Sequence, residues 1–321
     1  MTPQIGIIIV SYNAAECITQ CLKSLSSSLM DFAPGQVQVL IWDNNSQDGT
    51  VEWIKQNYPQ YQLHLSPDNV GFDAANNFGY KILQPSQYLV LLNDDTVVDK
   101  DWLKNLIKTA EARPETMIVQ SQLRLWPDQE ILNSWGNEIH FLGYGYAGGY
   151  KVKAVAAPVG QLNDGKVISY ASGAGLLGYQ TVLAPDSIVY HQYQFKKSMA
   201  KYFYMERNRW LVLLQNYHWA TLVLLAPALI TMELGTFVYS LLTGWYKEKL
   251  KVYSYFCHGK NWAEIRRKRQ VVQTMRRKRD REVAVPFTGR IEFQDLQNPL
   301  LTIINPIFGA YWYVIKNLIW W

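Results

Sequence analysis

The stretch IGIIIVSYN, residues 5–13, is an apolar run that ends in polar residues. Its first six residues are mostly β-branched, which favours a strand buried on both faces. Later polar segments, each after an apolar run, are WDNNSQDGT (42–50), DNVGF (68–72) and LNDDT (92–96). Apolar residues at helical spacing lie between these runs. Strands that alternate with helices predict an α/β fold with a mostly parallel sheet and flanking helices on both faces.

The apolar runs set the expected elements. We expect strands over residues 5–10, 37–42 and 88–92, and a weak strand that ends at 64–66. We expect helices from residue 18 onward and over 50–57, 74–83 and 101–112. In an open sheet of this kind, ligands bind beyond the carboxyl ends of the strands. The polar residues after each run are therefore the first candidates for a binding site.

Asp94 and Asp95 are the strongest catalytic candidates. They follow the strand expected over residues 88–92. A carboxylate at a rigid strand end supplies a hard oxygen ligand to Mg²⁺ or Mn²⁺, and such a cation bridges the oxygens of a diphosphate leaving group. For the two residues taken alone, a solvated turn after a strand is the alternative.

In this order the polar segments resemble the family 2 glycosyltransferases of the GT-A fold, in their rhamnosyltransferase-like bacterial branch, over roughly residues 4–215. The resemblance implies a Rossmann-like nucleotide-sugar-binding sheet, a UDP- or dTDP-sugar donor, inversion at the anomeric carbon and a Mn²⁺ or Mg²⁺ cofactor. It gives the metal to Asp95, the last residue of a D-x-D variant, and to His191, which ends a V-Y-H motif. For His191 alone, a hydrogen-bonded core role is the alternative.

The resemblance also implies the donor contacts. Asp43 would accept from the N3–H of uracil or thymine, and Gly71 would bring backbone N–H groups near the nucleotide. The predicted nucleotide-sugar-binding residues are Ser11, Asn13, Asp43, Asn45, Asn69, Gly71, Phe72, Asn76, Asp94, Ser172 and Gly173. Asp48 is open between a ligand role and capping the next helix. Asn76 is open between a ligand role and a place in the first turn of its helix.

The chain departs from the family pattern after SGAGLL, residues 172–177. In the family, a segment with the acceptor-binding helix and the general base follows, but here Leu177 runs directly into Gly178. The sequence has no Glu or Asp between Ser172 and Pro185, so the catalytic base is unknown. The alternative function is a catalytically impaired donor-binding relative, a scaffold or deletion product. A sugar nucleotidyltransferase is disfavoured because no Gly-rich triphosphate loop follows the first strand.

The 321 residues, 49% of them hydrophobic, suit one large α/β core with a smaller appendage. We expect a GT-A domain over residues 1–215 and a helical, basic, membrane-associated region over 216–321. Three cysteines are too few for a disulfide framework, so we expect reduced thiols. The amino terminus shows no leader pattern, which favours the cytosol for the catalytic half. The stretch 126–150, rich in Gly, Tyr and Trp, is expected to form loops and short antiparallel strands that line the acceptor side.

The segment 220–242 is apolar and long enough to cross a bilayer core of ~30 Å at ~1.5 Å per residue. A span would leave the basic stretch 247–281 on the wrong side of the membrane, and Pro227 and Glu233 interrupt the segment. We therefore predict in-plane or re-entrant helices on the cytoplasmic face of the cell membrane, with basic clusters at 266–269 and 276–279 against anionic lipids. The expected acceptor is a lipid-linked or cell-surface glycan. Nucleic acid is the disfavoured alternative partner, because the flanking segments are too apolar.

Overall fold

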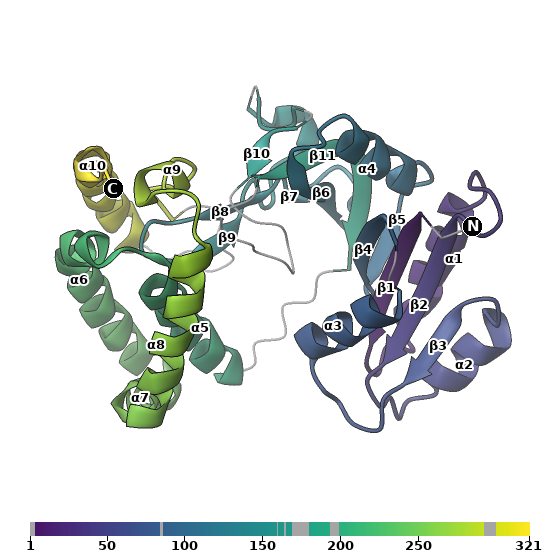
Figure 1. Cartoon of the computed structure of the whole chain (residues 1–321), viewed down its shortest axis with the longest axis horizontal. Coiled ribbons are helices and arrows are strands. Elements are labelled where there is room, and N and C mark those ends of the chain that lie inside the picture. The colour runs from purple at the N-terminus through teal and green to yellow at the C-terminus, as the bar shows by residue number, and fades with distance from the viewer. Residues whose placement is uncertain are drawn as a thin grey trace.

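The computed structural model describes residues 4–83, 86–158, 160–163, 165–168, 180–192, 199–291 and 300–321. Its amino-terminal half is built on a sheet of four parallel strands (Figure 1). The strands are β1 (Ile5–Ser11), β2 (Val37–Asp43), β3 (Gln62–Leu65) and β4 (Tyr88–Asn93), in the order β3-β2-β1-β4. The parallel register places Val10 beside Trp42 and Asn93. The carboxyl ends of three strands therefore meet at one edge.

Helices cover both faces of this sheet, because both sets of alternating side chains of β1 are apolar. Ile7 and Ile9 pack in one core with residues of the first two helices, and Ile8 packs in a second core with Ala75 of the third. The helices are α1 (Ile18–Ser28), α2 (Thr50–Asn57) and α3 (Phe72–Ile82). The predicted α/β class, with a parallel sheet and flanking helices, is confirmed.

A second sheet contains the strand that ends at His191, one of the two predicted metal ligands. Its long strands β6 (Thr116–Leu125) and β11 (Gln180–His191) run parallel, and the order is β10-β11-β6-β7, with β5 paired to β11. The other elements of this part are β5 (Thr96–Val98), α4 (Trp102–Glu111), β7 (Leu132–Ser134), β8 (Asn137–Ile139), β9 (Gly145–Ala147), the 3-10 helix η1 (Ala154–Ala156) and β10 (Val167–Ile168). The expectation of short antiparallel strands within 126–150 is correct, since β8 and β9 form a hairpin.

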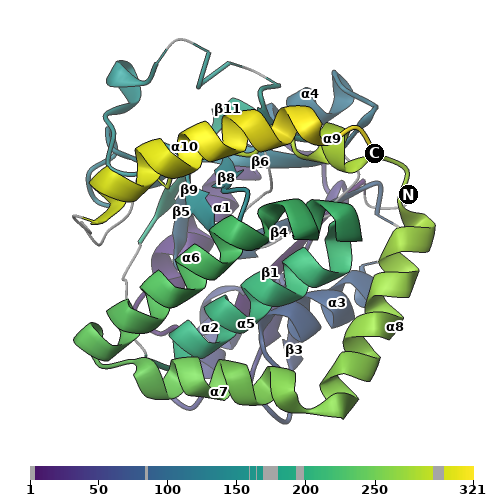
Figure 2. The ribbon, with the colours of Figure 1, turned by 90° about the vertical axis from the view of Figure 1, so that its left-hand side faces the viewer.

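The carboxyl-terminal region is helical (Figure 2). It comprises α5 (Met199–Asn216), α6 (Trp219–Thr243), α7 (Tyr246–Cys257), α8 (Gly259–Met275), α9 (Asp280–Val283) and α10 (Leu300–Leu318). Its core contains Leu213 of α5, Leu229 of α6 and Trp312 of α10, and it also takes in Phe141 and Leu142 from the β8–β9 turn. The helical region is thus packed onto the β8–β9 hairpin, which forms a separate two-stranded sheet. The division at residue 215 stays a prediction.

Helix α6 runs without a break through Pro227, and it is the one helix of the described residues that is long and apolar enough to cross a membrane. Glu233 does not interrupt its outer face, because its carboxylate accepts from Arg209 of α5 at 2.8 Å and pairs with Lys249 of α7 at 2.8 Å. The side chain of Glu233, one of the two features that weighed against a span, therefore points into the helical bundle. The choice between an in-plane and a spanning helix stays open to experiment.

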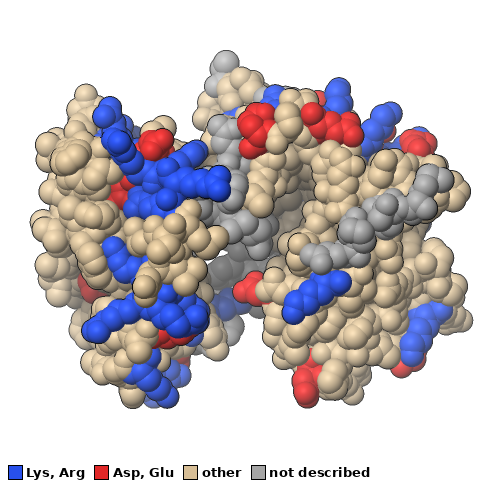
Figure 3. Space-filling view, viewed as in Figure 1, with Lys and Arg blue, Asp and Glu red and all other residues tan. Residues whose placement is uncertain are grey.

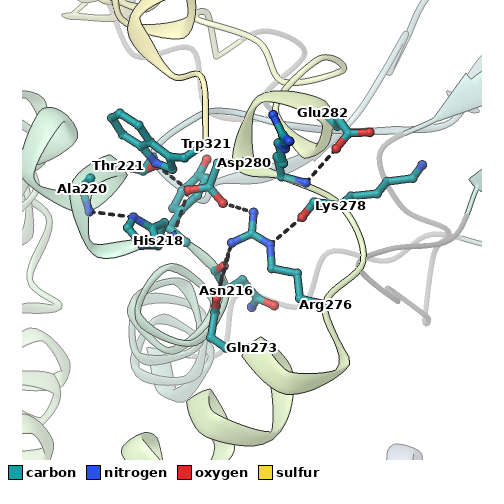
Figure 4. A network of polar contacts seen from close by, with 12 residues as sticks. Asn216, His218, Ala220, Thr221, Gln273, Arg276, Lys278, Asp280, Glu282 and Trp321 are labelled. Carbon is teal, nitrogen blue, oxygen red and sulfur yellow. Dashed lines mark hydrogen bonds and ion pairs between the residues drawn. The ribbon is translucent and has the colours of Figure 1, made fainter.

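Part of the basic sequence is structural. Arg276 pairs with Asp280, which also accepts from the Thr221 hydroxyl and from the His218 N–H, so this side chain joins α8 to the start of α6 (Figure 4). Arg269 donates to the carbonyls that end α5. Several neighbours, among them Arg266, Arg277 and Lys278, are exposed. The basic clusters predicted to face lipid therefore contribute only some of their charges to the surface.

Candidate active site at the edge of the two sheets

The two predicted metal ligands meet although they lie 96 residues apart in the sequence. Asp95 follows β4, and His191 ends β11. The short strand β5 pairs antiparallel with β11, so that Thr96 is the partner of His191. This register brings His191 Nε2 to 3.2 Å from Asp95 Oδ2. The pair of Asp95 and His191 therefore lies where the first sheet ends and the second begins.

The pair fits a divalent cation. Asp95 Oδ1 is buried and accepts no hydrogen bond from the described residues, which is costly unless a ligand takes the place of a donor. Two ligands at right angles in the octahedral shell of Mg²⁺, each at ~2.1 Å, lie ~3 Å apart, close to the 3.2 Å observed. A hard carboxylate beside an imidazole also suits Mn²⁺. Diphosphate oxygens and water would supply the other ligands.

Asn133 of β7 holds the histidine ring. Its Oδ1 lies 3.2 Å from His191 Nδ1, on the side of the ring away from Asp95. Such a contact fixes the orientation of a ligating histidine. The sequence carries no signal for this residue, because Asn133 reaches the site through the pairing of β7 with β6 and of β6 with β11. Described residues contain no cluster of three His, Cys, Asp or Glu that would form a complete protein cage.

Asp94 is more buried than its neighbour and lies beside the end of β1. Burial, and next the charge of Asp95, raise the pKa of Asp94 to about 7. Hydrogen bonding from the Tyr12 backbone and from the Ser11 side chain opposes that rise. Ser11 itself is fully buried. The place of Asp94 among the nucleotide-sugar-binding residues stays a prediction.

The turn after β2 is stabilised by Asp43, which was predicted to bind the nucleotide sugar. Asp43 is 1% exposed, and its two oxygens accept from the Ser46 N–H and the Ser46 hydroxyl. Each carboxylate oxygen can accept a further bond. A contact with a pyrimidine N3–H thus requires the base to enter beside Ser46, and the Asp43 assignment stays a prediction.

Two loops are clasped together across the edge of the sheet. The Asn13 N–H donates to Ser46 Oγ, and Asn13 Oδ1 accepts from the Gln47 N–H at 2.8 Å. Asp48 accepts from the Ala15 N–H and from the Thr50 N–H. Asp48 therefore has a structural role at the start of α2, one of its two predicted roles. Both Asn13 and Asn45 adopt positive φ, which asparagine tolerates better than most residues, and Asn45 Oδ1 accepts from Gln47 Nε2.

The segment before α3 forms a tight turn. Asn69 Oδ1 accepts from the Gly71 N–H, and Gly71 has φ of 85°, where a side chain would be strained. Phe72 begins α3 and is partly exposed, and Asn76 donates to the Phe72 carbonyl within the helix. Asn76 is the fifth residue of α3, just beyond its first turn, and its place at the ligand stays a prediction. A sequence reading missed the neighbouring stack of Trp42 between His64 and Phe78, with ring centroids 4.0 and 5.4 Å away.

Ser172, Gly173 and the junction of Leu177 with Gly178 lie outside the described residues. Of the carboxylates nearest the expected base in sequence, Glu206 is held by Arg209 at 3.1 Å and by Lys249 at 2.6 Å. Burial tends to raise the pKa of Glu206, but these two cations outweigh it and hold the pKa below its usual value. Glu206 is thus a paired structural carboxylate, and Asp186 is exposed on β11.

A comparison with known protein families finds a match that includes nearly all of the four parallel strands of this sheet. Residues 6–149 match the family model described as Glycosyl transferase family 2. Over these residues the chain matches the family 2 glycosyltransferases, the family that the order of its motifs predicted.

Among curated proteins, Glycosyltransferase AglE of Haloferax volcanii is 31% identical over 110 residues, which cover 33% of this chain and 35% of AglE. The aligned part thus spans about a third of that relative. Among solved structures, S. aureus TarS 1-349 in complex with UDP-GlcNAc is 14% identical, with a TM-score of 0.48, over 98% of this chain and 90% of TarS 1-349. GalNAc-T7 with UDP, GalNAc and Mn2+ is 13% identical, with a TM-score of 0.48, over 67% of this chain and 48% of that chain.

Proposed function

We propose that this protein is a metal-dependent glycosyltransferase that moves a sugar from a UDP- or dTDP-sugar to a lipid-linked or cell-surface glycan. The observation that carries the proposal is the His191–Asp95 pair, 3.2 Å apart, with a buried Asp95 oxygen that no described donor satisfies. The pair lies at the carboxyl end of a parallel sheet in a family 2 domain. That is where an open α/β sheet binds a nucleotide.

The described residues have separable tasks in this reaction. Asp95 and His191 would hold Mn²⁺ or Mg²⁺, which when bound neutralises the charge of the leaving diphosphate. Asn133 keeps the imidazole in place. The clasp between Asn13, Ser46 and Asp48 fixes the two loops against which the nucleoside would rest. With these groups fixed before binding, little orientation has to be gained when the donor arrives.

Inversion at the anomeric carbon follows from the family resemblance, and it needs a carboxylate to take the acceptor proton. No described residue is assigned that role. For the acceptor, a lipid-linked or surface glycan is proposed because α6 exposes apolar side chains along its outer face, including Val223, Ile230 and Leu234. Association with the cytoplasmic face of the membrane, and a place in polysaccharide or cell wall synthesis, are parts of the same proposal.

Calorimetry with UDP tests the donor site. With Mn²⁺ present, the full chain should bind UDP at least about tenfold more tightly than with EDTA, equivalent to ~1.4 kcal/mol. Asp95→Ala should remove this difference, because it takes away the carboxylate that links the cation to the protein. Asp186→Ala, at an exposed carboxylate elsewhere on β11, is the matched control and should leave the difference intact. Equal affinity of the unaltered chain with and without metal would contradict the proposal.

A further inference from the structure

A cavity of about 380 Å³ lies outside the proposed donor site, between the β8–β9 hairpin and helix α10. Its walls include Tyr146 of β9, Thr288 and Arg290 of the segment after α9, and Trp312, Tyr313 and Lys316 of α10. The volume is within the usual range for a small-molecule site, ~300 to 1,000 Å³. Neither Arg290 nor Lys316 belongs to the nucleotide or metal constellations.

Two walls of the cavity come close together because Gly289 has no side chain. A Cβ on Gly289 would come within 2.8 Å of Gly309 Cα, so the chain after α9 touches the backbone of α10 at this point. Gly309 itself has room: a Cβ there would meet only Arg290, at 3.6 and 3.8 Å. Trp312 is buried and donates its indole N–H to the Phe287 carbonyl. The floor of the cavity is therefore rigid, and its filling by a larger residue at 309 is sterically possible.

The two charged side chains of the cavity that lack an ion-pair partner among the described residues are both positive. Arg290 and Lys316 are both exposed, and neither forms an ion pair with a residue that the structure describes. Lys316 Nζ lies 5.5 Å from the centre of the Tyr313 ring. The one acidic lining residue, Glu138, is already engaged, since its two oxygens accept from the Trp135 indole and from the Tyr146 hydroxyl. Two cations at a cavity mouth favour an anion, and phosphate most of all when one of them is Arg.

An apolar surface adjoins the cavity. Four apolar residues of α10 are exposed and fall on one side of the helix, because they are spaced by four, seven and four residues. They are Ile303, Ile307, Val314 and Leu318. On α6, Val223, Ile230, Leu234 and Leu241 form a second exposed stripe. The two helices lie near each other on one side of the molecule (Figure 2). Apolar stripes of this extent mark an interaction surface.

Basic residues flank this surface. Lys and Arg side chains gather over the helical region that contains α8 and α9 (Figure 3). A bilayer with anionic headgroups matches both the apolar stripes and the positive flank. A soluble anion would account for the cations and leave the stripes exposed to water. The occupant that satisfies both features is a lipid.

We propose that the cavity between the β8–β9 hairpin and α10 binds the phosphate group of a membrane lipid, with Arg290 and Lys316 as its cations. The lipid tails would continue along the exposed stripe of α10. The site is separate from Asp95 and His191, so it does not depend on the proposed transfer reaction.

Flotation of the full chain with vesicles tests this site. The probes are vesicles of phosphatidylcholine alone and of phosphatidylcholine with 20% phosphatidic acid, a fraction on the order used for anionic membranes. The unaltered chain should partition more strongly to the second. Arg290→Gln/Lys316→Gln should lose most of that increase, about tenfold in partition. Lys247→Gln/Lys260→Gln removes the same two charges at exposed positions of the helical region outside the basic clusters and should lose no more than about threefold, the size of a screened surface effect.

A volume variant separates the cavity from general surface charge. Gly309→Leu fills the cavity without changing charge and should also remove most of the increase with phosphatidic acid, whereas Gly235→Leu, at an open position of α6, should not. Circular dichroism verifies that each variant is folded. Equal losses in the two charge variants, together with normal flotation of Gly309→Leu, would overturn the proposal. Calorimetric binding of inorganic phosphate that abolishes flotation at millimolar concentration would overturn the lipid as the occupant.

Discussion

At the scale of single residues, burial without a charge partner has the clearest consequence at His140. The imidazole is fully buried among Phe141, Tyr144 and Phe308, and its Nδ1 accepts from the Leu142 N–H. Burial, and to a lesser degree the charge of Arg209, lower its pKa to about 3. The folded protein therefore keeps this ring neutral at pH values where the unfolded chain, with a pKa of ~6.5, takes up a proton.

This histidine should make folding sensitive to mild acid. Below pH ~6.5 the unfolded state binds a proton that the folded state does not, so stability falls as the pH is lowered, by up to ~1.4 kcal/mol per unit and ~2 kcal/mol between pH 7 and pH 5. His140→Phe keeps an aromatic ring at this position and removes the titrating group. Thermal unfolding of the two proteins at pH 7, 6 and 5 should show a smaller loss for the variant. Parallel decreases would mean that His140 does not titrate on unfolding.

The proximity of Asp95 and His191 could be predicted from the resemblance to the family, because a strand-end carboxylate and a V-Y-H motif each carry a recognisable pattern. Asn133 could not, since no local pattern says that β7 will lie beside β6. Only part of the clasp through Ser46 and Asp48 could be predicted from the sequence. Capping was foreseen, but the bond from the Ala15 N–H to Asp48 depends on how two loops meet in space.

At the scale of elements, three helices of the carboxyl-terminal region are joined by one buried ion network. Glu206 and Arg209 come from α5, Glu233 from α6 and Lys249 from α7, with contacts of 2.6 to 3.1 Å. Two positive and two negative charges balance, and Lys249 is completely buried. The network explains how an acidic residue can sit within the apolar helix α6.

Breaking this balance should destabilise the helical region strongly. Lys249→Met leaves two carboxylates opposite one guanidinium and should cost ~3 to 5 kcal/mol. Glu206→Gln/Lys249→Met restores neutrality and should recover part of that loss. Lys251→Met, two residues away on α7 at an exposed lysine that pairs with Glu248, should cost no more than ~1 kcal/mol. Comparable melting temperatures for the Lys249 and Lys251 variants would show that the network contributes little.

The helices and strands of the first half could be predicted from periodicity nearly to the residue, as with α2 at Thr50–Asn57. Helix α3 begins two residues earlier than expected, at Phe72, because the Gly71 turn leads directly into it. In the second half, the expected basic helical stretch 246–282 is divided into α7, α8 and α9. The break at His258 lies next to Gly259, a residue type that favours a break, and the packing of α5 against both α7 and α8 accompanies the bend.

At the scale of the whole molecule, the proposed metal pair and most of the predicted donor residues lie in or beside the two sheets, and the surfaces proposed to face lipid belong to the helices. The β8–β9 turn joins them, because Phe141 and Leu142 lie in the core of the helical region. A chain cut at residue 215 would expose that core, which also contains Leu225 and Trp312. Sequence alone did not indicate this joint, since it depends on contacts between segments more than 60 residues apart.

The last prediction separates donor binding from transfer. Donor binding should be retained by the chain as it stands, because the predicted contacts before Thr96 and the metal contact from His191 do not require the segment that relatives carry after Leu177. Transfer to a glycan acceptor should be slow, because general-base help is worth ~10²- to 10⁴-fold and orientation of the acceptor contributes further.

Insertion of the family's base-bearing helix between Leu177 and Gly178 should raise the transfer rate while leaving UDP affinity unchanged. An insert of equal length with its carboxylates changed to amides is the matched control and should give no increase. Rates of sugar transfer and UDP binding measured on the same preparations distinguish the two steps. Robust transfer by the unaltered chain, with a pH profile that reports one essential base, would show that a carboxylate already present performs this role. Glu206 is not that carboxylate, because Arg209 and Lys249 already hold it as a paired structural charge.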